Sequence, residues 1–535
     1  MSNRELYAKV GVANIPHILS MVDRNLLSPT YGCFDRSYWH YKTSSFPSGM
    51  YQEFVLPLAL CFLHPIPGGE QFHNQPRLRE LILAGIRYAA ASSHRDGSCD
   101  DYFPYERALG AAAFSLYAAT ESYLLLGLSE EDIVSFFQKR GRWLMAHQES
   151  GRLSNHHALV VLALCNVYLI TGEQTYRKGA QKRLDLLLGW QTEEGWFPEY
   201  EGCDPGYLTA TIDFLAKYFK KSSDERVLEP LKAAVLFASQ FVHPDGSYGG
   251  EYGSRNTCIF FPHGFELMGE FLPEAVETAD LYLEGVCKGR QVHLEDDRMC
   301  AHLAWDHLQA YLDFRQRPPD RALPSRAEKR RYWRGAGIYV HVTQERYAVV
   351  SAAKGGVVRL YVAGELAYGD SGIIARLSNG KTLVSHRMGN YEVTLLDDGI
   401  QVFGHFNRYQ FKLPNPLTQA MFHLGMLTVG RWGSNLVRLF LQKVLIVGVS
   451  RDPMKFRRTF RLGPPSTLVD EIWNPKRDSS SRDVIALYAG TDHTSIYVAM
   501  SNSFQSASLL PWTDYGAYIA ELNRDGYVRI ERRIG

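Results

Sequence analysis

A short turn with a central glycine recurs through the first half of this 535-residue chain. The sequence His94-Arg95-Asp96-Gly97-Ser98 returns as His243-Pro244-Asp245-Gly246-Ser247, and Glu149-Ser150-Gly151 and Glu193-Glu194-Gly195 lie between them in similar contexts. The glycines at 97, 151, 195 and 246 are therefore 54, 44 and 51 residues apart. Each interval holds two helix-length segments with apolar residues at helical spacing. A period of this size is typical of an array of helical hairpins.

Polar and aromatic clusters follow the four glycines, at residues 101–107, 154–157, 196–200 and 252–256. An array of hairpins can coil open as a solenoid or close into an (α/α) toroid. In a closed toroid, the turns after one set of helices gather around a central cleft. The repeated position of the clusters therefore favours closure and one shared site, although each cluster could instead be a helix cap or a turn.

From about residue 332 the pattern changes to short alternating apolar runs, such as residues 337–342 and 357–362. Hairpin signals such as Ser378-Asn379-Gly380-Lys381 separate some of them. Residues 315–331 contain three prolines and a run of charges, which is typical of a linker. We therefore predict a helical toroid domain at residues 1–320 and an antiparallel β domain at residues 332–535.

Composition excludes several classes of protein. Lysine plus arginine number 58 and aspartate plus glutamate 57, so a general nucleic-acid binder is not expected. We see no export signal at the N-terminus and no apolar run of about 18 residues that would span a membrane. None of the eight cysteines forms a C-x-x-C pair. We therefore expect reduced thiols, a cytoplasmic location, and no membrane partner; the oligomeric state stays open.

The clusters together supply an amide (Asn155), an imidazole (His156), phenols (Tyr105 and Tyr207) and a guanidinium (Arg255). These groups suit removal of a proton α to a carboxylate. A cation and an amide hold the carboxylate as negative charge develops, and an imidazole or phenol moves the proton. On a uronate sugar this chemistry is β-elimination, or C5 epimerisation if the proton returns to the other face. No metal-ligand spacing is apparent, and we expect no cofactor.

The order of the motifs resembles the heparinase II/III-like family. The resemblance is carried by residues 32–42 (GCFDRSYWHYK), 101–107 (DYFPYER), 154–158 (SNHHA) and 195–200 (GWFPEY), and in the second half by 335–339 (GAGIY) and 353–356 (AKGG). It covers most of the chain and is strongest between residues 30 and 265. It implies an incomplete (α/α) toroid followed by an antiparallel β-sandwich, and lyase chemistry on acidic, uronate-containing polysaccharides.

The resemblance also implies roles for single residues. The Asn-His pair of the family corresponds to Asn155 and His156, its tyrosine to Tyr207, and Arg255 would clamp a carboxylate. We therefore predict Asn155, His156, Tyr207 and Arg255 as catalytic residues. Around them, the candidate substrate-binding residues are Tyr105, Glu106, Arg107, Trp196, Glu199, Asn256, His263 and His405.

One departure from the family concerns its β-domain histidine. Residues 354–361 occupy the expected region without a histidine, and His341, His386 or His405 could substitute from neighbouring strands. Four functions therefore stay open: a polysaccharide lyase, a uronate C5-epimerase, a non-catalytic glycan-binding protein of exopolysaccharide synthesis, and a two-carboxylate glycoside hydrolase. Packing interpretations also stay open, among them pairing of Arg255 with Glu251.

Overall fold

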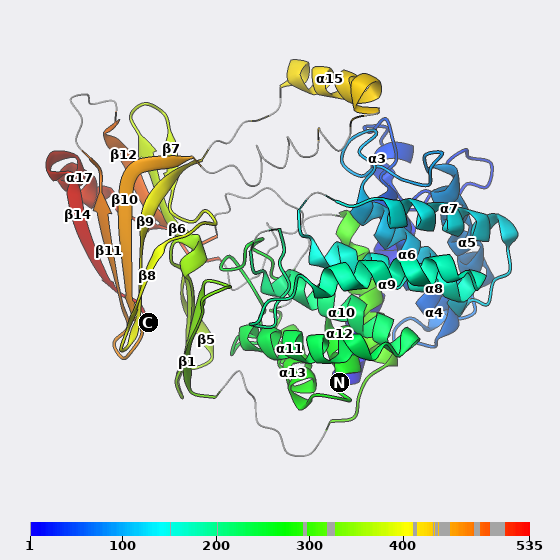
Figure 1. Ribbon diagram of the computed structural model, residues 1–535, viewed down its shortest axis with the longest axis horizontal. Helices are drawn as coiled ribbons and strands as arrows, with labels where there is room; N and C mark the ends of the chain where they lie inside the picture. Colours follow the sequence, from blue (N-terminus) through cyan, green and yellow to red (C-terminus); the bar gives the residue numbers. More distant parts are fainter. Residues whose placement is uncertain are drawn as a thin grey trace.

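The structure is a computed structural model that describes residues 2–149, 151–200, 202–290, 292, 297–317, 327–409, 413, 415–431, 433, 437, 450–475, 482–492 and 509–535. Its helical part and its sheets lie side by side, on the right and left of Figure 1. The helices α1 to α14 end at Leu312, and the first strand begins at Lys329. The order of helices and then strands agrees with the change of pattern in the sequence.

The helical part is a ring of helical hairpins. The inner helices are α4 (Val55–Leu63), α6 (Leu109–Leu125), α8 (Ser154–Thr171), α10 (Pro205–Ser222), α12 (Pro262–Met268) and α14 (Cys300–Leu312); each contacts the next, and α14 contacts α4. Their outer partners are, in the same order, α5 (Pro76–Ala91), α7 (Glu131–Ala146), α9 (Gln174–Leu188), α11 (Leu228–Ala238), α13 (Pro273–Cys287) and α1 (Asn3–Ala13). The short helices α2 (Ile15–Met21) and α3 (Arg36–Trp39) follow α1. The (α/α) toroid is therefore confirmed, and the N-terminal helix supplies the partner of the last inner helix.

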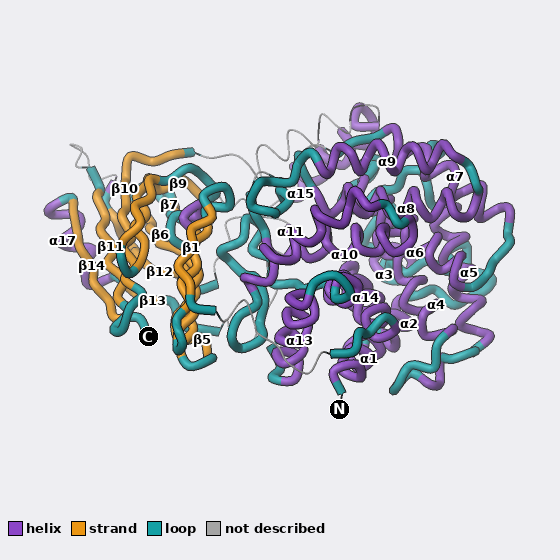
Figure 2. Tube along the Cα trace, turned by 60° about the horizontal axis from the view of Figure 1, so that its bottom comes forward, coloured by secondary structure: helices purple, strands orange, loops and turns teal. Residues whose placement is uncertain are grey.

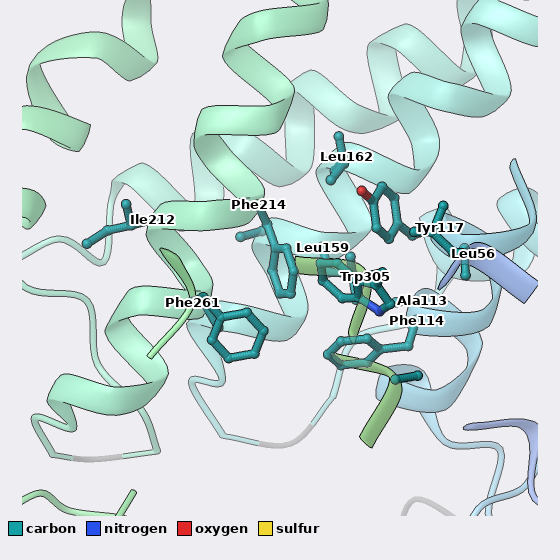
Figure 3. Close-up of a cluster of buried hydrophobic side chains, with 14 of the residues drawn as sticks. Leu56, Ala113, Phe114, Tyr117, Leu159, Leu162, Ile212, Phe214, Phe261 and Trp305 are labelled. Carbon is teal, nitrogen blue, oxygen red and sulfur yellow. The ribbon is translucent and has the colours of Figure 1, made fainter. Parts of the chain in front are cut away.

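The inner helices are apolar on nearly all sides, which is the pattern of a buried helix. In α6 every residue from 109 to 123 is buried. Figure 3 shows the aromatic centre of the ring, where Phe114, Phe214, Phe261 and Trp305 converge from four different segments. Their ring centroids lie 5.8 to 6.3 Å apart in neighbouring pairs, the range of favourable aromatic packing. Among the described residues, α8 alone is long and apolar enough to cross a membrane, and 72% of it is buried inside the fold.

The repeated glycines occupy equivalent turns. Gly97, Gly151, Gly195 and Gly246 all have φ between 84° and 96°, where a side chain would be strained. A Cβ on Gly97 would lie 2.8 Å from the backbone of α7, and one on Gly246 would lie 2.3 Å from the backbone of α13. The turns at Gly97, Gly195 and Gly246 therefore need glycine because each packs against a following outer helix. Gly32, with φ 90°, packs against α5 in the same way, although the sequence repeat does not include it.

The second part consists of two antiparallel sheets, whose strands are orange in Figure 2. The first has the order β1-β2-β3-β4-β5, and the second has nine strands in the order β13-β12-β6-β7-β9-β10-β11-β14, with β8 paired to β9. The strands are β1 (Lys329–Trp333), β2 (Ile338–Val342), β3 (Arg346–Ser351), β4 (Val357–Val362), β5 (Glu365–Asp370), β6 (Gly372–Leu377), β7 (Thr382–Val384), β8 (Glu392–Leu396), β9 (Gly399–Tyr409), β10 (Arg451–Arg461), β11 (Thr467–Trp473), β12 (Val484–Gly490), β13 (Thr513–Asp514) and β14 (Tyr527–Arg533). The helix α17 (Ile519–Asp525) precedes β14.

The first sheet is the middle layer of the molecule. One face shares a hydrophobic cluster with the second sheet, in which Val350 and Leu360 meet Val402 and Phe460. Side chains of its other face, such as Tyr347, belong to the large cluster of the helical domain. This two-sided burial explains why its strands β2 to β4 are buried almost throughout.

The β part also contains a helix that the sequence pattern did not predict. The helix α15 (Pro416–Gly425) follows β9 and lies beside the helical domain in Figure 1, away from both sheets. Asn415 caps it by accepting a hydrogen bond from the backbone of Thr418. Its Phe422 ring packs 5.4 Å from that of Phe103. The expectation of β structure throughout the second half is therefore wrong at this segment.

Candidate functional site

Two segments that follow the second and third repeated glycines, residues 152–155 and 198–200, pair with one another. Leu153 and Glu199 form an antiparallel bridge. This pairing places the side-chain amide of Asn155, at the start of α8, beside the carboxyl group of Glu199. Asn155 Nδ2 donates to Glu199 Oε1 at 2.8 Å. Two of the predicted clusters therefore meet in space.

Glu199 is buried, with 2% of its surface exposed. Burial raises the pKa of its carboxyl group to about 7, against the lowering influence of Arg255, His156 and the Asn155 amide. The desolvation cost of an ionised carboxylate explains the direction of this shift. Glu199 is thus poised to exist as a neutral acid or as a carboxylate near neutral pH. This residue was predicted only to bind substrate, and the structure puts it at the centre of the predicted catalytic residues.

The imidazole of His156 is oriented by a carboxylate. His156 Nδ1 lies 2.6 Å from Glu149 Oε2, and the Glu149 side chain is 3% exposed. Because a carboxylate only accepts hydrogen bonds, this contact assigns the proton of neutral His156 to Nδ1. The lone pair is then on Nε2, as a general base requires.

Arg255 approaches from the cluster at residues 252–256. Its guanidinium carbon lies 3.8 Å from the centroid of the Tyr200 ring, and the residue is 5% exposed. Its backbone N–H donates to Asp204 Oδ2 at 2.7 Å. Among the described residues, Arg255 Nε has no hydrogen-bond partner. The alternative pairing with Glu251 is not seen, since the Glu251 carboxylate accepts hydrogen bonds from Arg359.

Tyr207 lies in the first turn of α10, where Asp204 caps the helix by accepting from the Tyr207 backbone at 3.0 Å. Burial raises the pKa of its phenol well above the usual value; Arg255 acts to lower that pKa and Glu199 to raise it. Desolvation of the phenolate outweighs the attraction of the Arg255 guanidinium, so the resting phenol keeps its proton.

These electrostatic neighbours of Glu199 and Tyr207 thus connect three of the four clusters. Asn155, His156 and Arg255 act on the pKa of Glu199, and Arg255 and Glu199 act on the pKa of Tyr207. Backbone strain accompanies this arrangement. Tyr105, Arg107, Tyr200 and Asn256 all adopt positive φ between 53° and 60°, which is costly for residues other than glycine and is common at functional sites.

The loop at residues 101–107 forms a neighbouring wall, and two of its predicted substrate-binding residues have structural partners. Glu106 Oε2 accepts backbone hydrogen bonds from Asp101 and Tyr102, and Arg107 pairs with Asp96 at 2.8 Å. The Tyr105 ring stacks on His94 at 5.3 Å. The Tyr102 phenol influences the pKa of Tyr207, so this loop borders the site.

Three other predicted substrate-binding residues are buried in protein contacts. Trp196 is 6% exposed and its indole N–H donates to Glu194, so its ring packs in the core and presents no open face to a sugar. Asn256 accepts a hydrogen bond from Lys354. His263, on α12, binds Asp313 at 2.7 Å in a different cluster. Each of the three side chains therefore has a hydrogen-bond partner within the protein.

The cluster around His263 includes a group that could hold a metal ion. Ligand atoms of Asp213, His263 and Asp306 lie within 4.8 Å of one another. The ammonium of Lys217 lies between the carboxylates, 2.5 Å from Asp213 Oδ2 and 3.4 Å from Asp306 Oδ1. Burial raises the pKa of Asp306 well above its usual range. With Asp306 protonated, the ammonium of Lys217 balances the single charge of Asp213.

A cleft of about 840 Å³ lies in the β part, at its border with the helical part. His405, Asn407 and Arg451 line it, and Gly202, three residues after Glu199, is its lining residue from the helical part. The predicted catalytic residues Asn155, His156, Tyr207 and Arg255 are not among its lining residues. Of the three histidines considered as substitutes for the β-domain histidine of the family, His405 lines this cleft. His341 and His386 are 3% and 2% exposed.

The sequence pattern did not predict roles for Glu149 or Asp204. Both orient predicted catalytic residues through hydrogen bonds. Glu149 fixes His156, and Asp204 joins the first turn of α10 to the backbone of Arg255 and Thr257. The sequence did carry one signal. Asp204 precedes Pro205-Gly206, an arrangement typical of a helix start.

No protein-family model matches this chain, and a search of curated proteins found no match. Among solved structures, chondroitin AC lyase of Streptomyces coelicolor A3, solved in complex with chondroitin sulphate, aligns with a TM-score of 0.54 at 9% identity. The alignment covers 91% of this chain and 68% of that chain. This chain has the fold of chondroitin AC lyase. Heparinase III aligns at a TM-score of 0.49 and 11% identity, over 88% of this chain and 71% of that one. At such identities the likeness shows the fold alone: an (α/α) toroid followed by antiparallel sheets.

Proposed function

We propose that this protein is a polysaccharide lyase that cleaves a uronate-containing glycan by β-elimination after abstraction of the C5 proton. One observation carries the proposal. A buried carboxyl group, Glu199, has a pKa raised to about 7, is hydrogen-bonded to Asn155, and lies in the field of Arg255. A neutral acid, an amide and a guanidinium are together suited to hold a carboxylate whose charge grows during proton abstraction.

The substrate carboxylate would contact Glu199 and Arg255. With Glu199 protonated, its O–H donates to one carboxylate oxygen, and Arg255 supplies the compensating positive charge. Arg255 Nε is a buried donor that lacks a protein acceptor among the described residues, which fits an anionic ligand. These contacts make the C5 proton more acidic, because the enediolate that forms on its removal carries negative charge on the same carboxylate oxygens.

Proton transfer would use His156 and Tyr207. His156 Nε2, with Nδ1–H bound to Glu149, takes the proton from C5. Electrons of the C5–H bond form the C4–C5 double bond, and the C4–O bond breaks. Tyr207, whose pKa is raised by burial, donates its phenol proton to the leaving oxygen. Return of the proton from His156 to Tyr207, directly or through water, restores the site.

The substrate would be an acidic polysaccharide or oligosaccharide that extends from the site at Glu199, past Gly202, into the cleft lined by His405, Asn407 and Arg451. Asn407, His405 and Arg451 on the β side offer an amide, an imidazole and a cation to hydroxyl and anionic groups of a glycan. This cleft is of the size that accommodates a few sugar units, in the usual range of about 300–1,000 Å³ for ligand sites.

A C5-epimerase is the second candidate. The site has both an imidazole and a phenol around one carboxylate pocket, and two proton-transfer groups on opposite faces would return the proton with inversion. Incubation with polymer in heavy water distinguishes the two reactions: an epimerase introduces deuterium at C5 without shortening the chain.

The proposed function is tested by mass spectrometry of products from heparin, chondroitin sulphate, hyaluronan and alginate. A lyase gives oligosaccharides that are one water lighter than hydrolysis products, and His156→Ala abolishes them. Products of hydrolytic mass would refute the proposal in favour of a glycosidase. Binding without any product from the four polymers would favour a glycan-binding protein.

A further inference from the structure

The first turn after β3 lies where the two parts of the molecule meet. This turn, Ala352–Lys354, is followed by Gly355 and Gly356 with φ of 64° and 89°. The backbone N–H of Ala353 donates to the Gly337 carbonyl at 3.1 Å, and the Ala353 carbonyl accepts from Gly389 at 3.0 Å. Ala353 and Gly389 both line the cleft of the β part. The turn therefore fixes part of the cleft wall.

The side chain of Lys354 leaves this turn and enters the helical domain. Its ammonium donates to the carbonyl oxygens of Glu251 and Gly253, the latter at 3.0 Å, and to Oδ1 of Asn256. Lys354 is 2% exposed. An ammonium has three N–H donors, and here all three have an acceptor in one short loop. Such complete pairing offsets the cost of burying the charge.

The loop that Lys354 binds is the one that carries Arg255. On its other side, Asp204 accepts the backbone N–H of Arg255 at 2.7 Å. Glu251, at the start of the loop, pairs with Arg359 of β4 at 2.6 Å. The helical domain thus holds one side of the loop, and the β domain holds the other through Lys354 and Arg359.

We propose that Lys354 is a positioning residue for carboxylate recognition: from the β domain it holds the loop at residues 251–256 so that Arg255 stays over Tyr200 and faces Glu199. The hydrogen bonds from Lys354 to the loop at residues 251–256 are part of the fold. Their effect on carboxylate recognition by Arg255 rests on the proposed function.

The β domain would thus contribute to carboxylate recognition through Lys354 and not through a histidine. Replacement of Lys354 by an uncharged side chain removes this donor from the Glu251 carbonyl and the Asn256 amide oxygen, and leaves the Gly253 carbonyl with only the Asn256 N–H at 3.2 Å. The loss of these hydrogen bonds favours opening of the loop to water. Arg255 would then lose its fixed position, while Asn155, His156 and Glu199 keep their contacts on the other segments. Affinity for a carboxylate should fall more than affinity for a neutral glycan.

The first measurement is hydrogen–deuterium exchange of the full chain, which needs no substrate. In Lys354→Met, amides of residues 253–257 should exchange at least tenfold faster, whereas those of β14, remote in the second sheet, keep their rates. The matched control is Lys381→Met, a lysine exposed in the turn between β6 and β7. Unchanged exchange at residues 253–257 in Lys354→Met would overturn the proposal.

The second measurement compares calorimetric binding of chondroitin sulphate oligosaccharides with that of the same oligosaccharides after reduction of their carboxyl groups. Wild type should prefer the carboxylated form, and Lys354→Met should lose at least tenfold of this preference. Equal loss for both forms would mean a purely structural role and would overturn the positioning role. If wild type shows no preference for the carboxylated form, the proposed function fails, and the exchange data still decide whether Lys354 holds the loop. If Lys354→Met does not fold, Lys354→Gln is used, with the same expected direction and the same refuting results.

Discussion

Replacement of Glu199 by glutamine should remove a pH dependence of stability that the structure assigns to one carboxyl group. Glu199 has a pKa of about 7 in the folded protein because it is buried, whereas an unfolded glutamate titrates near ~4.3. A difference of about 2.7 units corresponds to about 4 kcal/mol between the two protonation states. Glutamine keeps the size of the side chain and an oxygen that can accept from Asn155.

The direction follows from proton linkage. A carboxyl group whose folded pKa is raised binds more protons in the folded state, so its contribution to stability is complete below the unfolded pKa and is lost as pH rises toward the folded pKa. Wild type should therefore lose stability between about pH 4.3 and pH 7 through this group. The change from pH 5 to pH 8 should be about 2–3 kcal/mol larger in wild type than in Glu199→Gln.

The assay is urea unfolding at several pH values between 5 and 8, with Glu225→Gln as the control because Glu225 is exposed. Wild type and the control should show the same pH dependence, and Glu199→Gln a shallower one. Parallel pH dependence in wild type and Glu199→Gln would show that Glu199 titrates normally. The neutral-acid role in carboxylate binding would then be refuted.

Three further substitutions test the proposed chemistry through turnover of whichever polymer is cleaved. Arg255→Lys should fold but raise KM about tenfold or more, since an ammonium cannot reproduce the planar guanidinium over Tyr200; unchanged KM would remove Arg255 from carboxylate binding. Tyr207→Phe should lower kcat on the order of 10²-fold with little change in KM, as expected for lost acid catalysis, and an unaltered kcat would discard that role. Glu149→Gln should lower kcat about tenfold or more by weakening His156 as a base, and equal activity at every pH would show that Glu149 is not needed.

The toroid could be predicted from sequence because its determinants are local and repeated. The turns at Gly97, Gly195 and Gly246 need positive φ and close approach to a helix backbone, so these glycines mark equivalent positions wherever the hairpins lie. The turn residues repeat as well: Ser98 bonds the Asp96 carboxylate just as Ser247 bonds that of Asp245.

The details of the site could not be predicted because they depend on contacts between distant segments. The pKa of Glu199 reflects its burial and the charges and hydrogen bond supplied by Arg255, His156 and Asn155, which come from two other clusters. Trp196 is of a residue type that often stacks on sugar rings. Its side chain is buried instead, and its indole N–H donates a hydrogen bond to Glu194. His263, a candidate site residue, follows an apolar run. Its hydrogen-bond partner Asp313 lies 50 residues later in the chain, and no local sequence pattern connects the two. Lys354 lies in a segment noted for its likeness to the family and for its lack of histidine, and its contacts lie about 100 residues earlier in the chain.

β-Elimination on a uronate by the residues around Glu199 can be followed by ultraviolet absorbance. Only elimination creates the conjugated C4–C5 double bond beside the carboxylate, so absorbance of the unsaturated product should rise with time on at least one uronate polymer. Wild type should show this rise, Asn155→Ala and His156→Ala should lose it, and the carboxyl-reduced polymer should give no rise. Release of reducing ends without any rise in absorbance, or a rise that survives both substitutions, would refute β-elimination by these residues.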